Sequence, residues 1–354
     1  MLWIIFLLSI LIAFGTTQLS IVLSLRRGVL DVPNIRSSHS APVPRIGGIG
    51  IVSAFYLSFA VFTALGKVGF PAYSVLTREV LAALLIGAGM AAIGLCDDLR
   101  GLNPAPKFLL QLFLAAIAVG LGSRVESLSI PLWGKVMLGV LSIPLTLLWL
   151  TGFANVYNFM DGIDGLAGGT GVVYGAFFFA IAWQQGDPGL AVVAVLLTGG
   201  CLGFLYHNFP QARTFMGDVG SLFLGMAFAL FVVQLAQRSQ NPASLVAHLM
   251  ICSVYLYDSG FTLLRRIARR ENIFRAHRSH LYQRMVQAGW NHGKVTAFYL
   301  VLHTLVGSLA LLYLRVSGAA QLGIIGCVTV ILLTFTLGVY WLEHRTARSK
   351  PADA

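Results

Sequence analysis

Long uninterrupted runs of apolar residues, separated by short polar connections, dominate the chain. A helix needs roughly 20 residues to cross the hydrocarbon core of a bilayer, and the runs approach or exceed that length. They lie at 2–25, 47–66, 79–96, 106–122, 131–151, 169–184, 189–206, 219–237, 243–261, 295–315 and 321–342. The pattern predicts an all-α, polytopic membrane helix bundle of about 11 transmembrane helices, built as a single domain over residues 1–354.

Composition agrees with this pattern. Of the 354 residues, 57% are hydrophobic and only 10% are charged, whereas a soluble domain has roughly 25% charged residues. The mean hydropathy is +0.81. The first run has no basic residue before it, no small-residue cleavage site, and Arg26 and Arg27 directly after it. These features favour a retained membrane span over a signal peptide.

Basic residues are distributed unevenly between the two sides of this predicted bundle. If the spans alternate in direction, one side holds the connections 26–46, 97–107, 152–168, 207–218, 262–294 and 343–354, with 18 of the 24 Lys and Arg residues. Positive charge collects in cytoplasmic connections. We therefore expect the N-terminus outside, the C-terminus in the cytoplasm, and 262–294 as a basic cytoplasmic loop.

The formal net charge of +11 thus belongs to a cytoplasmic surface. Nucleic acid is not expected as a partner, because no soluble module presents the charge. Membrane lipids with anionic head groups and phosphorylated substrates fit better. A transporter would place ionisable groups near the bilayer midplane, whereas here they cluster at the ends of spans. The sequence leaves open whether the chain forms a homodimer.

The first polar motif is "IGLCDDLRGLNPAPKFLLQ", in which Asp97 and Asp98 end the third run and Lys107 begins the fourth. Adjacent carboxylates repel each other and need a cation or a proton between them. A solvated turn between two spans is the alternative. The acids directly follow the apolar "AAIGLC", which favours a functional pair.

The second motif is "NVYNFMDGIDGLAGG", with Asn155, Asn158, Asp161 and Asp164 at every third position. On an α-helix such neighbours lie about 60° apart, so the four spread over half the helix surface. Helix capping explains one of them at most. Amide and carboxylate oxygens together suit Mg²⁺, and the glycines of the motif permit a ligand to approach the backbone closely.

Two further motifs add one acid and one cation. In "RTFMGDVGSLFLG", Asp218 precedes an apolar helix, where it is either an N-cap or a metal ligand. The two acidic motifs on the same side favour the metal ligand. In "SSHSAPVPRIGGIG", residues 37–50, Arg45 adds a cation near the same site.

The last motif, "RRIARRENIFRAHRSHLYQRM", spans 265–285 and carries seven arginines. Its simplest interpretation is an anchor on anionic lipid. His277 and His280 share a helix face at i and i+3, and together with Arg278 they are suitable donors for phosphate. A zinc pair is weakly supported, because no nearby Cys or His completes four ligands. Taken together, the five motifs favour Mg²⁺-dependent phosphoryl transfer between a soluble diphosphate and a lipid.

These motifs, in this order, resemble those of the polyprenyl-phosphate N-acetylhexosamine-1-phosphate transferases, which are of the glycosyltransferase family 4 type. The resemblance extends from 37 to 285 and rests on "SSHSAPVPRIGG", "GLCDDLRGL", "NVYNFMDGIDGLAGG", "FMGDVGSLFLG" and "AHRSHLYQRM". The histidine motif and the length are most similar to the bacterial branch that initiates O-antigen, and hence lipopolysaccharide, synthesis.

The resemblance implies a reaction at the cytoplasmic face of the bacterial inner membrane. An undecaprenyl phosphate oxygen would attack the β-phosphate of a UDP-N-acetyl sugar, giving the lipid-diphosphate sugar and UMP. Mg²⁺, or Mn²⁺ in its place, would be the cofactor. Which sugar is used, among GlcNAc, FucNAc, QuiNAc and others, stays open.

The resemblance also implies residue roles. Asp218, Asn158 and Asp161 would hold the metal, and Asp97 and Asp98 would receive or deprotonate the lipid phosphate. Deprotonation has less weight, because a phosphate monoester with a second pKa of about 6 is already ionised at neutral pH. The implied catalytic residues are Asp97, Asp98, Asp161 and Asp164, and the implied substrate-binding residues are Arg45, Lys107, Asn155, Asn158, His277, Arg278 and His280.

The sequence departs from the family pattern in two places. Leu99 and Arg100 follow the aspartate pair, so the third acid of some members is missing, and Arg278 with Ser279 separates histidines that are adjacent in others. Two alternative functions remain at this stage. One is an ion-coupled membrane transporter, and the other is an intramembrane aspartyl protease, which needs two aspartates that share a proton.

Overall fold

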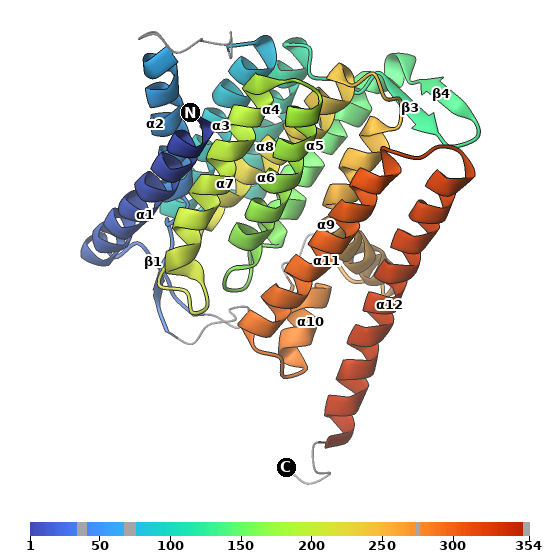
Figure 1. Cartoon of the computed structure of the whole chain (residues 1–354). Coiled ribbons are helices and arrows are strands. Elements are labelled where there is room, and N and C mark those ends of the chain that lie inside the picture. The colour runs from blue at the N-terminus through green and yellow to red at the C-terminus, as the bar shows by residue number, and fades with distance from the viewer. Residues whose placement is uncertain (34–40, 67–75, 273–276, 350–354) are drawn as a thin grey trace.

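The computed structural model describes residues 1–33, 41–66, 76–272 and 277–349 and is 76% helical. Its long helices pack side by side in a bundle (Figure 1). They are α1 Leu2–Arg27, α2 Ile49–Gly66, α3 Arg78–Arg100, α4 Pro104–Gly120, α5 Ser142–Phe159, α6 Leu166–Gln184, α7 Pro188–Asn208, α8 Gly217–Arg238, α9 Ser244–Ala268, α11 His292–Tyr313 and α12 Ala319–Ser349. A short helix, α10 Leu281–Gln287, precedes α11. The predicted all-α membrane bundle is confirmed.

Eight segments are helical, long enough and apolar enough to cross a membrane. They are Leu2–Arg27, Arg78–Arg100, Gly139–Phe159, Leu166–Gln184, Pro188–Asn208, Gly217–Arg238, His292–Tyr313 and Ala319–Arg348. Two predicted spans form shorter apolar helices, Ile49–Leu65 and Pro104–Gly120, and the ninth run forms α9. Each predicted run thus contains a helix, while the count of 11 spans stays a prediction.

Three predicted boundaries are wrong. The run 131–151 does not begin as a helix, because β3 Ser127–Ile130 and β4 Gly134–Met137 pair as an antiparallel hairpin and α5 starts only at Ser142. Local turn geometry is the reason: Gly134 has φ +87° and Leu132 φ +69°, values that a right-handed helix does not allow. Mean hydropathy cannot distinguish such a hairpin from a span.

The other two errors concern connections. The expected connection 152–168 shrinks to 160–165, because α5 continues through Asn158 to Phe159 and α6 begins at Leu166. The expected basic loop 262–294 is also partly helical, since α9 extends to Ala268 and α10 lies within it. Helices α5 and α9 both continue past the end of their apolar runs. A helix can include polar residues in its last turns, so the end of an apolar run does not mark the end of the helix.

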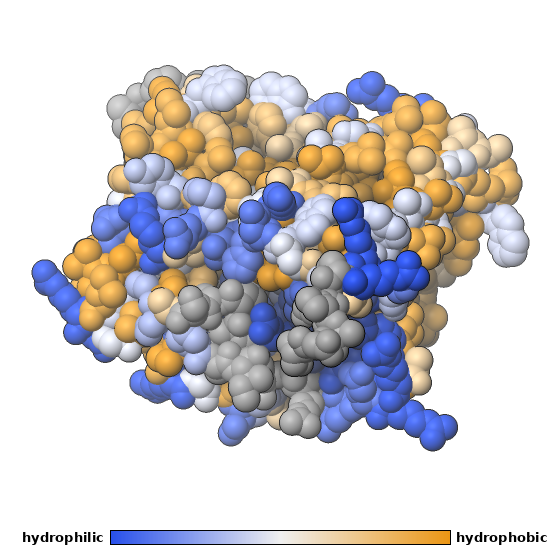
Figure 2. All heavy atoms as spheres, turned by 90° about the horizontal axis from the view of Figure 1, so that it is seen from below, coloured by the Kyte–Doolittle hydropathy of each residue, from blue (hydrophilic) through white to orange (hydrophobic). Residues whose placement is uncertain are grey.

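The central helix of the bundle is α8, in which 94% of the most apolar 18-residue stretch is buried. The two ends of the bundle differ in structure. The short pair β1 Leu30–Asp31 and β2 Val43–Pro44, helix α10 and the last turns of α12 lie at one end, while the β3–β4 hairpin lies at the other (Figure 1). Figure 2 shows the first end, where hydrophilic side chains gather next to a hydrophobic flank. This arrangement groups the connections as the charge pattern predicts.

Candidate active site

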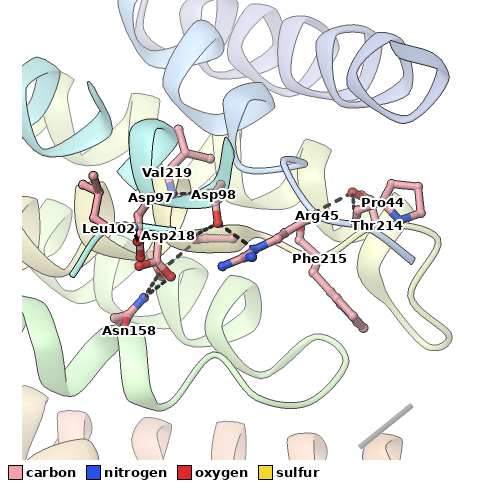
Figure 3. Close-up of polar contacts among 12 residues, drawn as sticks. Pro44, Arg45, Asp97, Asp98, Leu102, Asn158, Thr214, Phe215, Asp218 and Val219 are labelled. Carbon is pink, nitrogen blue, oxygen red and sulfur yellow. Dashed lines mark hydrogen bonds and ion pairs between the residues drawn. The ribbon is translucent and has the colours of Figure 1, made fainter. Parts of the chain in front are cut away.

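Three helix ends bring the first and third motifs together. Asp97 lies near the end of α3, Lys107 in the first turn of α4, and Asp218 in the first turn of α8. Lys107 Nζ lies 2.8 Å from Asp97 Oδ2 and also forms an ion pair with Asp218 Oδ2. The three side chains are 13 to 17% exposed. Lys107 thus bridges two carboxylates at a partly open position. Figure 3 shows the two acids, Asp97 and Asp218, side by side.

Asp98 has a different environment from its neighbour. Its side chain is fully buried and accepts hydrogen bonds from the backbone N–H groups of Asp218, at 3.1 Å, and Val219, at 2.9 Å. Arg45 Nε lies 3.0 Å from the same carboxylate. A carboxylate at a helix N-terminus satisfies free backbone donors and interacts favourably with the helix dipole. Asp98 therefore fixes the start of α8 and orients Arg45 (Figure 3).

Backbone contacts place Arg45 beside α8. The Phe215 N–H donates to Pro44 O at 2.8 Å, and the Gly47 N–H donates to Phe215 O at 2.9 Å. Gly217 has φ +68°, and a Cβ there would lie 2.5 Å from Arg45 O and 2.6 Å from Asp98 Oδ2. Only glycine fits this conformation and this space. The Gly-rich sequences around Arg45 and Asp218 therefore serve the close approach of two chain segments.

The second motif contributes one of its two asparagines to the cluster. Asn158 Nδ2 donates to Asp218 Oδ1 at 3.0 Å and to Ser221 Oγ at 2.8 Å. Asn155, one turn earlier on α5, instead donates to Gln111 Oε1 at 2.6 Å. Asn155 thus holds α5 against α4 and does not join the carboxylates. Neither Ser221 nor Gln111 stood out in the sequence.

The two aspartates of the second motif lie in the connection 160–165 but have different surroundings. Burial, followed by the charges of Asp218, Asp98 and Asp164, raises the pKa of Asp161 to about 8. Within the described residues, the Asp161 carboxylate has no hydrogen bond or ion pair. Asp164 Oδ2 instead lies 3.2 Å from His292 Nδ1 on α11. Asp161 is therefore the acid whose charge the surrounding protein leaves uncompensated.

A cavity lies next to Asp164. It has a volume of about 480 Å³, and its lining includes Pro210, Trp290 and His292 in addition to Asp164. His292 belongs to no sequence motif, and no pattern indicated that it would meet an aspartate 128 positions earlier. The predicted catalytic role of Asp164 remains a prediction, and its observed partner is a histidine.

The histidine motif packs against the end of α5. His280 is 5% exposed and precedes α10, and its Nδ1 lies 3.2 Å from Oδ1 of the buried Asp258. Tyr282 OH donates to Phe159 O at 3.1 Å, which connects α10 to the residue two positions before Asp161. Direct bonds between His280 and the Asp97, Asp98 and Asp218 carboxylates are not present among the described residues. Asp258 is a site residue that sequence reasoning missed, although it is a lone acid in the apolar run 243–261.

His277 and Arg278 lie outside this anchored contact. His277 Nδ1 is 3.0 Å from Ser279 Oγ. Burial, the neighbouring His280 and then Arg266 lower the pKa of His277 to about 4, so the ring is neutral near pH 7. Arg278 accepts a bond at its backbone oxygen from Gln287 Nε2, at 2.7 Å. Among the described residues, a carboxylate contacts His280 but not His277.

The donor set is compatible with a magnesium ion. Among the described residues, no group of three or more His, Cys, Asp or Glu side chains is arranged to hold a metal. Mg²⁺, however, commonly binds one or two carboxylates and completes its shell with water and substrate phosphates. Asp218 and Asn158 are in contact, and the nearby Asp161 carboxyl, with its pKa raised to about 8, would ionise when a cation binds. These oxygen donors fit a hard cation that arrives with a diphosphate.

Comparisons with known proteins agree with this site. Residues 80–236 match the model of the family described as glycosyl transferase family 4. This segment includes Asp97, Asp98, Lys107, Asn158 and Asp218, so the match covers the whole carboxylate cluster.

Three relatives extend the similarity over most of the chain. A probable undecaprenyl-phosphate N-acetylglucosaminyl 1-phosphate transferase of Bacillus subtilis (strain 168) is 31% identical, over 84% of this chain and 80% of its own. A decaprenyl-phosphate N-acetylglucosaminephosphotransferase of Mycobacterium leprae (strain TN) is 33% identical, over 91% of this chain and 87% of its own. A phospho-N-acetylmuramoyl-pentapeptide-transferase of Streptococcus suis (strain 05ZYH33) is 33% identical, over 64% of this chain and 67% of its own.

Proposed function

The chain belongs to glycosyl transferase family 4, and we propose that it transfers an N-acetylhexosamine 1-phosphate unit from a UDP-sugar to undecaprenyl phosphate. The names of the relatives support this enzyme class, since they are phosphotransferases of polyprenyl phosphates. The observation that carries the proposal is the cluster of Asp97, Lys107, Asn158 and Asp218 at one end of a membrane bundle. N-acetylglucosamine is the first sugar to test, because two of the relatives are named for it.

The reaction balances as a displacement at phosphorus. An oxygen of the lipid phosphate forms a bond to the β-phosphorus of the UDP-sugar. The bond from that phosphorus to the oxygen bridging to the α-phosphate breaks, and UMP leaves with its electron pair. The products are a lipid-diphosphate sugar and UMP. Because much of the barrier in phosphoryl transfer is electrostatic, cations and correct positioning are the main contributions a protein can make.

The residues of the cluster divide into three roles. Lys107 supplies a positive charge between Asp97 and Asp218 and is placed to bind phosphate oxygens. Asp97 is the more open acid of its pair and is the candidate to receive or orient the lipid phosphate. Asp98 positions Arg45 and the start of α8, because its oxygens already accept two backbone N–H groups and pair with Arg45.

Asp218, Asn158 and Asp161 would hold Mg²⁺, or Mn²⁺ in its place, and the bound cation would neutralise charge on the diphosphate. Among the described residues no cation or hydrogen-bond donor contacts the Asp161 carboxylate, which supports this choice, because a carboxylate without a protein cation gains most from a metal. His280 with Arg278 adds donors on the side of α10.

The finer biological setting remains a prediction. We expect the site to face the cytoplasm of a bacterial inner membrane and the product to initiate O-antigen, lipopolysaccharide or a related envelope glycan. The transporter and protease alternatives leave the Lys107 bridge and the arginine-rich motif without a role, and no relative named above is a transporter or a protease.

The test uses purified protein, undecaprenyl phosphate, Mg²⁺ and a panel of UDP-N-acetyl sugars, with UMP release as the readout. We expect release with at least one sugar, loss of release with EDTA, and a decrease of at least about 100-fold in Asp218→Asn, as for removal of a key electrostatic group. Glu126→Gln, an exposed acid on the β3–β4 side of the bundle, is the matched control and should retain full activity. Absence of UMP with every sugar would reject the activity. Unchanged release by Asp218→Asn would reject only the metal assignment.

A further inference from the structure

Asp258 is a fully buried carboxylate in α9 that belongs to none of the five sequence motifs. Its Oδ1 accepts the backbone N–H of Leu281 at 2.8 Å and lies 3.2 Å from His280 Nδ1. Its Oδ2 accepts the Tyr299 hydroxyl at 2.6 Å and the backbone N–H of Tyr282 at 3.3 Å. One carboxylate on α9 thus contacts the histidine, the first turn of α10 and a tyrosine of α11.

This contact fixes the histidine ring of the motif. A carboxylate that accepts Nδ1–H sets the orientation of an imidazole and leaves Nε2 as its only other polar atom. His280 Nε2 makes no hydrogen bond within the described residues. It is not one of the buried polar atoms that lack a partner, so solvent reaches it. Nε2 is therefore available to a ligand, and in the protonated ring it is an N–H donor.

The ring also lies close to the proposed reaction centre. Its centroid is 6.4 Å from that of Phe159, the last residue of α5, and Asp161 follows two positions later. Asp258 accepts the backbone N–H of Tyr282, and the hydroxyl of the same tyrosine donates to Phe159 O. Asp258 thereby sets the position of α10 relative to the connection that carries Asp161.

We propose that Asp258 is a positioning residue for the transfer reaction: it holds His280 through Nδ1 so that Nε2 faces a phosphate oxygen of the nucleotide sugar. This inference rests on the proposed function, because the diphosphate donor is its ligand. If the Asp258 carboxylate only stabilised the fold, its replacement would cost the same activity whether or not the His280 imidazole is present. Dependence on His280 therefore separates the two roles.

The test is a double-mutant cycle in the UMP-release assay, with Asp258→Asn, His280→Ala and the double variant. We expect Asp258→Asn to raise the KM for the UDP-sugar and to lower kcat/KM by about 10- to 100-fold, the range found for carboxylates that orient metal-ligating histidines. In the His280→Ala background the same change should cost less than about threefold, because coupled residues are not additive. A mere loss of folded protein would lower the apparent kcat and leave KM unchanged.

Tyr299→Phe is the matched control. It removes another hydrogen bond to Asp258 and leaves His280 in place, so we expect a lower thermal midpoint with an unchanged KM. Equal losses from Asp258→Asn with and without His280 would overturn the inference. If wild-type protein released no UMP from any sugar, the proposed function itself would fail, which is a distinct result.

A second measurement does not require the Asp258 variant to fold. In NMR spectra of protein labelled with ¹⁵N-histidine, the signals of the His280 ring are identified as those missing from the spectrum of the His280→Ala variant. We expect Nδ1 to carry a proton with and without UDP, and Nε2 to become protonated and its signal to shift when UDP is added, because a phosphate oxygen accepts a hydrogen bond and Nε2 must donate it. A ring that carries its single proton on Nε2, or an Nε2 signal unchanged by saturating UDP, would contradict the proposal.

Discussion

Two acids of the site differ in how far the protein compensates their charge. Asp98 accepts two backbone N–H groups and pairs with Arg45, whereas the Asp161 carboxylate has no such partner in the described part of the chain. Burial and the neighbouring acids raise the pKa of Asp161 to about 8. For an acid, this means that the folded protein binds a proton more tightly than the unfolded chain. The stability that this proton contributes is greatest below about pH 4 and is lost as pH rises through about 8.

Asp161→Asn should therefore stabilise the protein at high pH. An amide resembles the protonated acid, so without divalent cations the thermal midpoint of the variant should exceed that of wild type most at pH 9, by less at pH 6, and approach it only near pH 4. Added Mg²⁺ should reduce the difference at pH 9, because the metal compensates the carboxylate. Thermal unfolding in detergent with EDTA or Mg²⁺ measures this. A difference independent of pH would contradict the charge argument.

Gly162 tests the contact between the second motif and α10. A Cβ at this position would lie 2.0 Å from the Tyr282 hydroxyl oxygen and 2.9 Å from the ring carbon that bears it. We expect Gly162→Ala to lower UMP release by displacing α10 or the Asp161 connection. Adding Tyr282→Phe should restore part of the activity, because it removes the closest atom. If the second change gives no recovery, the steric contact is not the cause of the loss.

At the scale of elements, α12 supports α10. Its 31 residues give a length of about 46 Å, more than the roughly 30 Å hydrocarbon core. Its last turns therefore extend beyond the span and meet α10. Arg284, which is buried, forms two bonds of 2.7 and 2.6 Å with the Glu343 carboxylate, and its guanidinium lies over the Tyr340 ring at 4.3 Å.

Glu343→Gln should loosen α10 without unfolding the bundle. The change leaves a buried guanidinium with a weaker partner, at a cost of about 1 to 3 kcal/mol. Hydrogen exchange of residues 281–287 should then be faster by on the order of tenfold. Glu126→Gln, whose partner Arg124 is half exposed, is the control and should leave exchange in α10 unchanged. Unaltered exchange in Glu343→Gln would show that α12 does not support α10.

Hydrophobic patterning predicted elements well where a single physical property decides them. Each apolar run contains a helix, because a helix satisfies the backbone of a segment in lipid. The run 131–151 begins instead with the β3–β4 hairpin, since average hydropathy carries no information about backbone direction at Leu132 and Gly134. The end of α5 also depends on polar residues that pack against other helices, which periodicity within one segment cannot reveal.

At the scale of the whole molecule, the sequence could predict which motifs share a side but not which residues meet. Topology alone grouped Arg45, Asp97, Lys107, Asn158 and Asp218, and these do form one network. The contact of Asp164 with His292 joins positions far apart in sequence. Asp258 lies in an apolar run where one acid carries no periodic signal. Such partners depend on tertiary packing, so motif reasoning could not identify them.

The orientation of this one-sided site is the property on which the proposed reaction depends. A water-soluble UDP-sugar must reach Asp97, Lys107 and Asp218 from the cytoplasm. The assignment of these residues to the cytoplasmic side rests on the distribution of basic residues alone. In a cysteine-free background, which requires replacing the exposed Cys96 and Cys327 among others, single cysteines at Lys135 and Arg348 report the two ends. We expect a membrane-impermeant maleimide to label the cysteine at position 135 in intact cells and the cysteine at 348 only after permeabilisation. The opposite pattern would place the carboxylate cluster outside the cytoplasm, away from the nucleotide sugar, and a UDP-sugar could then not be its donor in the cell.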